Sequence, residues 1–280
     1  YLNVQSTSRQ KLPFGIGQIG KAFRNEITTG NFIFRTREFE QMEMEFFCHP
    51  NETSKWLDFW KQERLEWFKS LGINEDKLRL RAHGEDEMAH YSSACYDIEY
   101  KFDFGWSELE GIADRGTYDL DQHMKHSNKK LTYFDQVNNA HFVPAVVEAS
   151  AGVDRAMLTI LADAFCQEEV NGEKRTVMKL SPKIAPIKVA VFPLMNKLDM
   201  PDFADKITDD LRNNNIASFY DQGGSIGKRY RRQDEAGTPF GITVDHDTMD
   251  DNTVTLRYRD TMQQERIPAD KIVKVLKSEI

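Results

Sequence analysis

The segment from Phe23 to Phe47 carries charged residues whose spacing could bind a polyanion. The sequence FRNE is followed by a polar, glycine-containing stretch, Thr28–Asn31, and then by FIFRTREFEQMEMEFF. This pattern predicts a β-hairpin with its turn at Thr28–Asn31, which places Arg24 opposite Arg35. Two facing arginines repel each other in a bare sheet. A phosphate or carboxylate between them would remove the repulsion, because guanidinium groups bind oxyanions through two hydrogen bonds.

The second half of the same segment alternates between apolar and polar residues, which indicates a strand with two different faces. Met42, Met44 and Phe46 share one face, and Gln41, Glu43 and Glu45 share the other. The carboxylates could bind an ammonium group, so one hairpin face would offer a polyphosphate site and an amine site. The alternative is a surface ribbon with incidental ion pairs.

A second candidate anion site is the sequence EASAGVDR, Glu148 to Arg155. It predicts the end of a strand, small residues that let a ligand approach the backbone, and the start of a helix. Helix N-termini attract anions, and Arg155 in the first turn could reach back over the site. The alternative is an ordinary strand–helix joint in which Arg155 pairs with Asp154 or a neighbouring residue. Glu108 could bind Mg²⁺ together with phosphate oxygens, or it could be a solvated strand carboxylate.

The sequence GGSIGKRYRR, Gly223 to Arg232, resembles a phosphate-binding P-loop only superficially. Gln222 stands where the motif needs glycine, and Lys228 is followed by Arg229 instead of serine or threonine. What remains is the basic start of a helix that suits RNA phosphates, with an aromatic residue for stacking. A solvated helix face is the alternative. The candidate RNA-binding cations are Lys228, Arg229, Arg231 and Arg232.

Other chemistries find no support in the sequence. His123 and His126 lack the HExxH pattern, and the three cysteines form no CxxC pair, so we expect no zinc site. No GxSxG element is present, which argues against a serine nucleophile. No organic cofactor is expected. Catalysis by positioning and charge neutralisation on a polyphosphate is the better interpretation.

Length and composition narrow the function classes. The 280 residues suggest two domains. Lys and Arg number 37 against 45 Asp and Glu, a net charge of −8, which disfavours a protein coated in basic charge for DNA. Scattered cysteines favour a reducing cytoplasm, and no membrane span or signal peptide is visible. The chain begins at Tyr1 within what reads as mid-domain sequence, so we expect a part of a longer protein.

Most of the candidate site residues must be positioned by strands and helices that the sequence predicts in its first 170 residues. Residues 54–71 predict a helix whose tryptophans pack on a sheet, and 96–104, 107–112 and 143–150 predict strands. Residues 86–93 predict a short helix, 119–139 an exposed excursion and 152–165 a helix. The expected fold is an α+β domain at 1–170 with an antiparallel sheet flanked by helices.

A smaller domain is expected after a linker at 171–186. It would be an α/β domain with a mixed sheet at 187–280. Its predicted strands are 187–192, 216–220, 240–244 and 253–258, and its predicted helices are 203–213, 223–232 and 268–276.

These motifs together resemble those of class II aminoacyl-tRNA synthetases. FRNE with FRTREFEQMEMEFF resembles motif 2, and GVDR resembles motif 3. PFGIGQIGKAFRNE, WSELEGIADRGTYDL and EASAGVDR are similar to the homodimeric glycyl-tRNA synthetases, and residues 187–280 resemble their anticodon-binding domain. The resemblance implies glycine, ATP and tRNA(Gly) as substrates, Mg²⁺, and a homodimer formed through the catalytic domain. Motif 1 is not visible.

The resemblance also implies residue roles. Arg24 would contact the α-phosphate and the glycine carboxylate, Glu26 the adenine edge and Arg35 the β- and γ-phosphates, while adenine stacks on Phe39. Arg24, Arg155 and Glu108 would be catalytic, with Mg²⁺ held through Glu108. The implied ATP site is Arg24, Asn25, Glu26, Phe34, Arg35, Phe39, Glu108, Leu109, Gly152 and Arg155. The implied glycine site is Phe39, Gln41, Glu43, Glu148, Ser150 and Gly152.

The site would select glycine because it has no space for the side chain of a larger amino acid. Carboxylates would bind the ammonium group, while Ala149, Ala151 and Gly152 would exclude any side chain. The alternative function is a synthetase-like protein that binds RNA or a partner without catalysis. Such a protein has no reason to keep Arg24, Glu26, Glu43 and Arg155 together. A synthetase-like enzyme that adenylates another small acid without tRNA is disfavoured by the anticodon-like domain.

Overall fold

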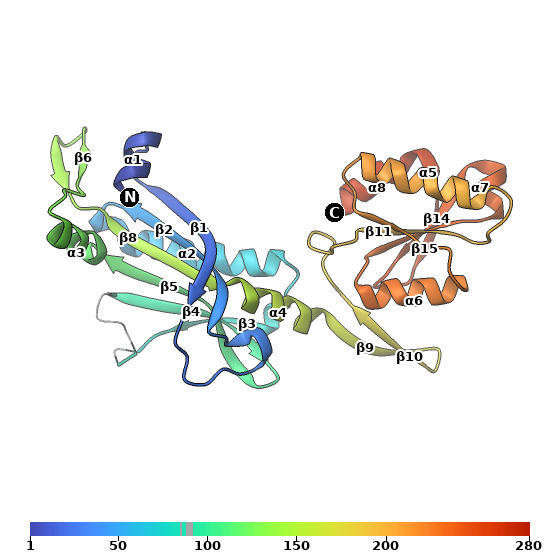
Figure 1. Ribbon diagram of the computed structural model, residues 1–280, viewed down its shortest axis with the longest axis horizontal. Coiled ribbons are helices and arrows are strands. Elements are labelled where there is room, and N and C mark those ends of the chain that lie inside the picture. Colours follow the sequence, from blue (N-terminus) through green and yellow to red (C-terminus); the bar gives the residue numbers. More distant parts are fainter. Residues whose placement is uncertain (85, 88–91) are drawn as a thin grey trace. The chain divides into compact units, whose positions relative to one another are not determined.

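The computed structural model describes residues 1–84, 86–87 and 92–280, which form two compact units, Tyr1–Thr159 and Ile160–Ile280 (Figure 1). The short helix expected at 86–93 includes residues outside the described ones. Helix α1 spans Leu2–Ser8, near the start of the first unit. A short 3₁₀ turn spans Pro50–Glu52.

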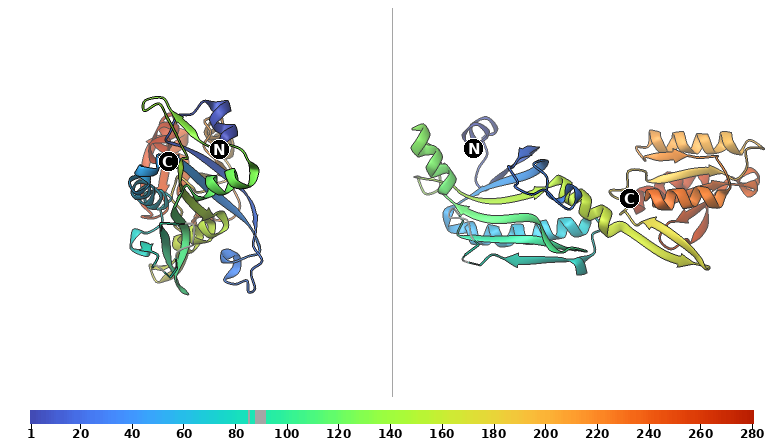
Figure 2. Two further views of the ribbon diagram at one scale, coloured as in Figure 1. Left: turned by 90° about the vertical axis from the view of Figure 1, so that its left-hand side faces the viewer. Right: turned by 60° about the horizontal axis from the view of Figure 1, so that its bottom comes forward.

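The first unit is built on a six-stranded antiparallel sheet with the order β1-β2-β8-β5-β4-β3. Helix α2, Thr53–Ser70, packs along one face of this sheet (Figures 1 and 2). The strands are β1 Phe14–Phe23, β2 Glu38–Cys48, β3 Leu78–Ala82, β4 Ala94–Phe102, β5 Gly105–Gly116 and β8 Ala145–Gly152. The predicted α+β fold with an antiparallel sheet is confirmed.

The alternation of β2 explains how α2 is held. The ring of Phe46 lies 4.8 Å from that of Trp56 and 5.3 Å from that of Trp60, centroid to centroid. The apolar face of β2 therefore packs against the aromatic residues of α2, as the sequence predicts, and its polar face is turned the other way. Just beyond the helix, Gly72 has φ +91°, a left-handed conformation that glycine adopts without strain.

The connection between β1 and β2 is longer than the predicted turn. Strand β1 ends at Phe23, opposite Glu38, and the backbone N–H of Arg24 donates to the carbonyl of Arg37 at 2.9 Å. Arg24 therefore lies opposite Arg37, and the predicted pairing with Arg35 is wrong. The cause is the 3₁₀ turn Phe32–Phe34, since Phe34 is buried with its ring 5.3 Å from that of Phe102.

Part of the excursion expected at 119–139 is a helix, α3, Tyr118–Ser127. Its Leu120 is buried in a cluster with Phe14, Phe47 and Val146, which anchors the helix to the sheet. The small strands β6, Tyr133–Asp135, and β7, Ala140–Phe142, follow as a hairpin. A 3₁₀ turn at Glu75–Lys77 precedes β3, and helix α4, Val153–Ala164, starts directly after β8.

The second unit contains a hairpin and a five-stranded mixed sheet with the order β12-β11-β13-β14-β15. Strand β11 is parallel to β12 and β13, and the other pairs are antiparallel, as the predicted α/β fold requires. The strands are β9 Phe165–Val170, β10 Glu173–Met178, β11 Val189–Pro193, β12 Ser218–Tyr220, β13 Phe240–Val244, β14 Thr253–Tyr258 and β15 Gln264–Pro268. The helices are α5 Met200–Asn213, α6 Ile226–Ala236, α7 His246–Asp251, the 3₁₀ turn Ala269–Lys271 and α8 Ile272–Glu279.

Residues 171–186 are not a plain linker, because they contain β10. That strand is tied to α6 and β14 through buried charges. Arg175 Nε donates to Asp234 Oδ2 at 3.0 Å, and Arg257 donates to both oxygens of Asp234 at 2.9 and 3.2 Å. Arg175 is 0% and Asp234 1% exposed. The hairpin is thus part of the second unit, while the domain limits at 170 and 187 stay a prediction.

Candidate active site

A cavity of about 250 Å³ lies on the polar face of the sheet in the first unit, bounded by β2, β5, β8, the start of α4 and the loop 24–37. Most of the residues predicted from the sequence line it. They are Arg24, Glu26, Phe34, Arg35, Phe39, Gln41, Glu108, Leu109, Glu148, Ser150, Gly152 and Arg155. Asn25 and Glu43 are not among its lining residues, although Glu43 is bonded to two residues that are.

Arg155 crosses the cavity and fixes its loop side. Its Nε donates to the carbonyl of Phe34 at 2.9 Å, and its Nη1 donates to the carbonyl of Glu108 at 3.0 Å. The guanidinium also lies 4.4 Å from the centre of the Phe34 ring. Asp154 instead accepts from the backbone N–H of Glu40 at 2.9 Å. The structure therefore favours the reach-back of Arg155 over its pairing with Asp154.

Two further arginines present positive charge to the same cavity. The Arg24 guanidinium lies 5.7 Å from the centre of the Phe39 ring, and Arg35 follows the Phe32–Phe34 turn. Among the described residues, neither has a carboxylate within 4.0 Å. Unpaired guanidinium groups beside a cavity are suited to phosphate or carboxylate oxygens.

The opposite end of the cavity is a hydrogen-bonded group on β2 and β8. The register pairs Glu43 with Ser150 and Gln41 with Gly152. Gln41 Nε2 donates to Ser150 Oγ at 2.6 Å and to Glu43 Oε1 at 2.9 Å, and Ser150 Oγ donates to Glu43 Oε1 at 3.1 Å. These bonds hold one oxygen of Glu43 in place.

Arg115 on β5 is a cavity-lining residue that the sequence reasoning missed. Its Nη1 donates to Glu148 Oε2 at 2.5 Å, and its Nε and Nη2 donate to Asp119 at 2.6 and 2.8 Å. The bond to Asp119 raises the pKa of Arg115 further above its usual range. The sequence does show an arginine at the end of the strand sequence GIADR. Its role could not be read from that position, because its partners lie on α3 and β8. Arg115 orients Glu148 toward the cavity.

Glu45 and Glu148 are direct cross-strand partners, and the charge of Glu148 affects the pKa of Glu45. Burial, reinforced by the negative charge of Glu148, raises the pKa of Glu45 to about 7. Burial also raises the pKa of Glu148, although Arg115 opposes the change. Near neutral pH Glu45 is therefore protonated in a large fraction of the molecules, which limits the negative charge at this end.

Comparison with known proteins decides the family. The model of the tRNA synthetase class II core domain (G, H, P, S and T) matches residues 2–164, which hold the whole cavity. The chain belongs to the class II tRNA synthetases. In the second unit of this synthetase chain, residues 188–279 match the anticodon binding domain.

Relatives of this synthetase chain are glycine–tRNA ligases. Those of Caldanaerobacter subterraneus subsp. tengcongensis and Geobacillus thermodenitrificans are 55% and 54% identical over all of this chain and 60% of their own. That of Thermobifida fusca is 53% identical over 99% of this chain and 61% of its own. The chain spans about 60% of the length of the curated relatives it matches.

A solved structure with the same fold is prolyl-tRNA synthetase from Cryptosporidium parvum complexed with L-proline and AMP. Its TM-score is 0.71 at 17% identity, covering 95% of this chain and 56% of that one. In the described part of the synthetase chain, no helix has the length and apolar character to cross a membrane.

The basic segment of α6 is only partly available for RNA. Lys228 and Arg232 are exposed, Arg231 is half-buried, and together with Ser225 and Gly227 they line a shallow surface depression. Arg229 is 3% exposed, and its Nη1 donates to the carbonyls of Pro193 at 2.6 Å and Asp221 at 3.3 Å. The prediction that Arg229 is a surface cation is therefore wrong.

Proposed function

We propose that this protein, as part of a full-length synthetase, activates glycine with ATP and transfers the glycyl group to tRNA(Gly). The observation that supports it is one cavity lined by arginines and by Glu148, which Arg115 orients, with the Glu43 carboxylate hydrogen-bonded to the lining residue Ser150. The identity of 53–55% to three glycine–tRNA ligases supports the choice of amino acid. A binding-only protein would not need this arrangement, so that alternative is not favoured.

In the first proposed step, a glycine carboxylate oxygen bonds to the α-phosphorus of ATP and the bond to the bridging oxygen of pyrophosphate breaks. Arg24 and Arg155 would neutralise the charge that develops on the phosphate oxygens. In the second step, a ribose hydroxyl of the tRNA attacks the glycyl carbonyl and AMP leaves. The protein's contribution is mainly the alignment of reacting groups.

Glu108 fits a role in holding Mg²⁺. Its carboxylate borders the cavity, is half exposed and lies 3.5 Å from Arg155 Nη1. One protein carboxylate together with phosphate oxygens is a common Mg²⁺ environment, and the ion would supply further positive charge to the polyphosphate.

Small residues around the amine end would leave no room for a side chain. Gly152 lies opposite Gln41, and Gly111 faces the carboxylates of Asp97 and Glu108. Ala149 and Ala151 differ from the expectation, because both lie on the face of β8 that α2 covers, where they pair with Met44 and Met42. The proposed selectivity for glycine therefore rests on Gly111 and Gly152.

Glu43→Ala tests the proposed ammonium site. We expect glycine KM to rise by about 100-fold or more, since losing a charged partner costs about 2–5 kcal/mol, while ATP binding stays measurable. Glycine-dependent ATP–pyrophosphate exchange gives KM, and equilibrium dialysis gives ATP binding. Glu40→Ala, on the opposite face of β2, is the matched control. An unchanged glycine KM in Glu43→Ala would refute this role.

The depression on α6 is the proposed tRNA-binding surface, with Lys228, Arg231 and Arg232 as its cations. Lys228→Glu combined with Arg231→Gln should raise tRNA KM by about tenfold at low salt, because phosphate contacts dominate such binding. Adenylate formation should be unaffected. Lys206→Glu on α5 serves as the control for added negative charge. If tRNA KM does not change, this surface does not bind tRNA.

The remaining sequence-based expectations complete the proposal. The synthetase would act as a homodimer through its catalytic domain, in the cytoplasm, without DNA or an organic cofactor. These points stay predictions.

A further inference from the structure

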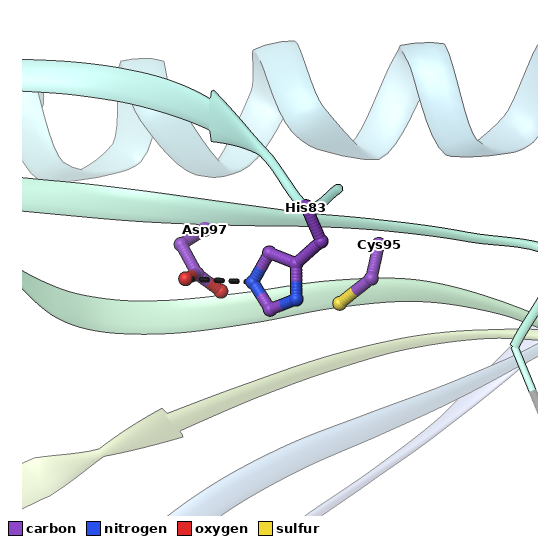
Figure 3. Close-up of side chains that lie close together, drawn as sticks. All are labelled: His83, Cys95 and Asp97. Atoms are coloured by element: carbon purple, nitrogen blue, oxygen red, sulfur yellow. Dashed lines mark ion pairs between the residues drawn. The ribbon is translucent and has the colours of Figure 1, made fainter. Parts of the chain in front are cut away.

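Three side chains that can bind a metal lie together at the β3–β4 edge of the cavity: His83, Cys95 and Asp97 (Figure 3). Strands β3 and β4 are antiparallel with Ala82 opposite Tyr96, and the N–H of His83 donates to the carbonyl of Cys95 at 3.0 Å. His83 is thus opposite Cys95. Cys95 and Asp97 share one face because side chains alternate along a strand. The backbone pairing itself brings the three groups together.

Their donor atoms are close to the spacing that zinc requires. One donor atom of each residue lies within 4.8 Å of the other two. The His83 ring lies between the Asp97 carboxylate and the Cys95 sulfur, with Nε2 2.8 Å from Asp97 Oδ2 (Figure 3). Zinc bonds of about 2.0–2.3 Å place tetrahedral donors roughly 3.3–3.7 Å apart. To bind one ion, the His83 ring would have to rotate out from between the Asp97 carboxylate and the Cys95 sulfur, which would close the remaining difference.

The chemistry of the donors selects the metal. A thiolate, an imidazole and a carboxylate together suit Zn²⁺, whereas Mg²⁺ and Ca²⁺ prefer oxygen ligands. The surroundings are also acidic, because the carboxylates of Asp97 and Glu108 both lie beside Gly111. A Cβ atom built on Gly111 would lie 3.9 Å from Asp97 Oδ1 and 3.9 Å from Glu108 Oε1. The Arg81 Nη1 lies 3.6 Å from Asp97 Oδ2 and offsets part of this charge.

We propose that His83, Cys95 and Asp97 bind one Zn²⁺ whose fourth coordination position faces the cavity. His83 and Cys95 both line the cavity, so water or a ligand there could fill that position. This proposal replaces the sequence-based expectation of no zinc site. That expectation considered closely spaced motifs, whereas these ligands come from two strands. The zinc site does not depend on the proposed ligase activity.

Metal titration of the chelator-stripped, reduced protein tests the site. We expect one equivalent of Zn²⁺, measured by competition with a chromophoric chelator. Co²⁺ should give a sulfur-to-cobalt charge-transfer band in the near ultraviolet. Cys95→Ser should remove that band and weaken Zn²⁺ binding by about 100-fold or more, exceeding the roughly 10–100-fold that loss of an outer-shell partner costs.

Two controls separate metal binding from misfolding. Cys166→Ser, on β9 in the second unit, should bind Zn²⁺ like the parent protein, whereas His83→Gln should lose binding with unchanged circular dichroism. In the parent protein, Zn²⁺ should slow alkylation of Cys95 by iodoacetamide, read by mass spectrometry. Binding weaker than about 10 μM (roughly 7 kcal/mol), or equal binding in Cys95→Ser, would overturn the proposal.

Discussion

Replacing Arg24 with alanine is expected to lower glycine-dependent ATP–pyrophosphate exchange by about 10²- to 10³-fold, the typical cost of removing one preorganised transition-state donor. Arg24 lines the cavity, lies beside Phe39 and, within the described residues, has no carboxylate partner within 4.0 Å. Its positive charge is therefore available to a phosphate. The loss should appear mainly in kcat, because the charge is needed most where negative charge develops.

Lys21→Ala is the matched control for this effect. Lys21 lies near the end of β1, which precedes Arg24, is 56% exposed and is paired with Glu38 at 3.0 Å. Its loss removes one positive charge three residues from Arg24 without altering the cavity, so exchange should stay within about twofold. An Arg24→Ala variant that folds and keeps exchange within about threefold of the parent would remove Arg24 from the proposed mechanism.

Asp234→Ala is expected to destabilise the second unit by about 3–5 kcal/mol. Asp234 is 1% exposed and bonds to both Arg175 and Arg257. Without it, Arg257 loses its carboxylate partner, while Arg175 keeps the ion pair with the more exposed Glu168 and its bond to the carbonyl of Arg259 at 2.6 Å. Urea unfolding followed by circular dichroism measures the change.

The control for this prediction is Asp209→Ala on α5. Asp209 is 71% exposed and lies 3.6 Å from Arg212, so its removal should change stability by less than about 1 kcal/mol. Asp234→Asn, which keeps the shape and some hydrogen bonds, should fall between the two. If Asp234→Ala unfolds like Asp209→Ala, the buried charges do not anchor the β9–β10 hairpin.

Local sequence patterns predicted those features of the fold that depend on the residues of a single strand or helix. The alternation of β2 assigned Phe46 to the apolar face, which proves to pack on α2, and the limits of β13 and β14 agree with the predicted strands. The small residues before Val153 correctly marked the start of α4. In each of these cases the periodicity reflects burial within a single strand or helix.

Features that depend on distant residues could not be predicted in the same way. The register of Arg24 was wrong because burial of Phe34 against Phe102 bends the chain into a 3₁₀ turn. Arg115 gains its role from Asp119 and Glu148, which lie on other elements. Charge alone also placed Arg229 on the surface, although it binds carbonyls in the interior. Such contacts exist only once the elements have packed.

Glycine-dependent ATP–pyrophosphate exchange by the full-length protein, compared among glycine, alanine and serine, tests the central proposal most directly. The account predicts exchange with glycine and at least about 100-fold lower kcat/KM with alanine or serine, because their side chains meet the wall of the cavity formed by Gly111 and Gly152. Absence of glycine-dependent exchange, or comparable exchange with alanine, would contradict it.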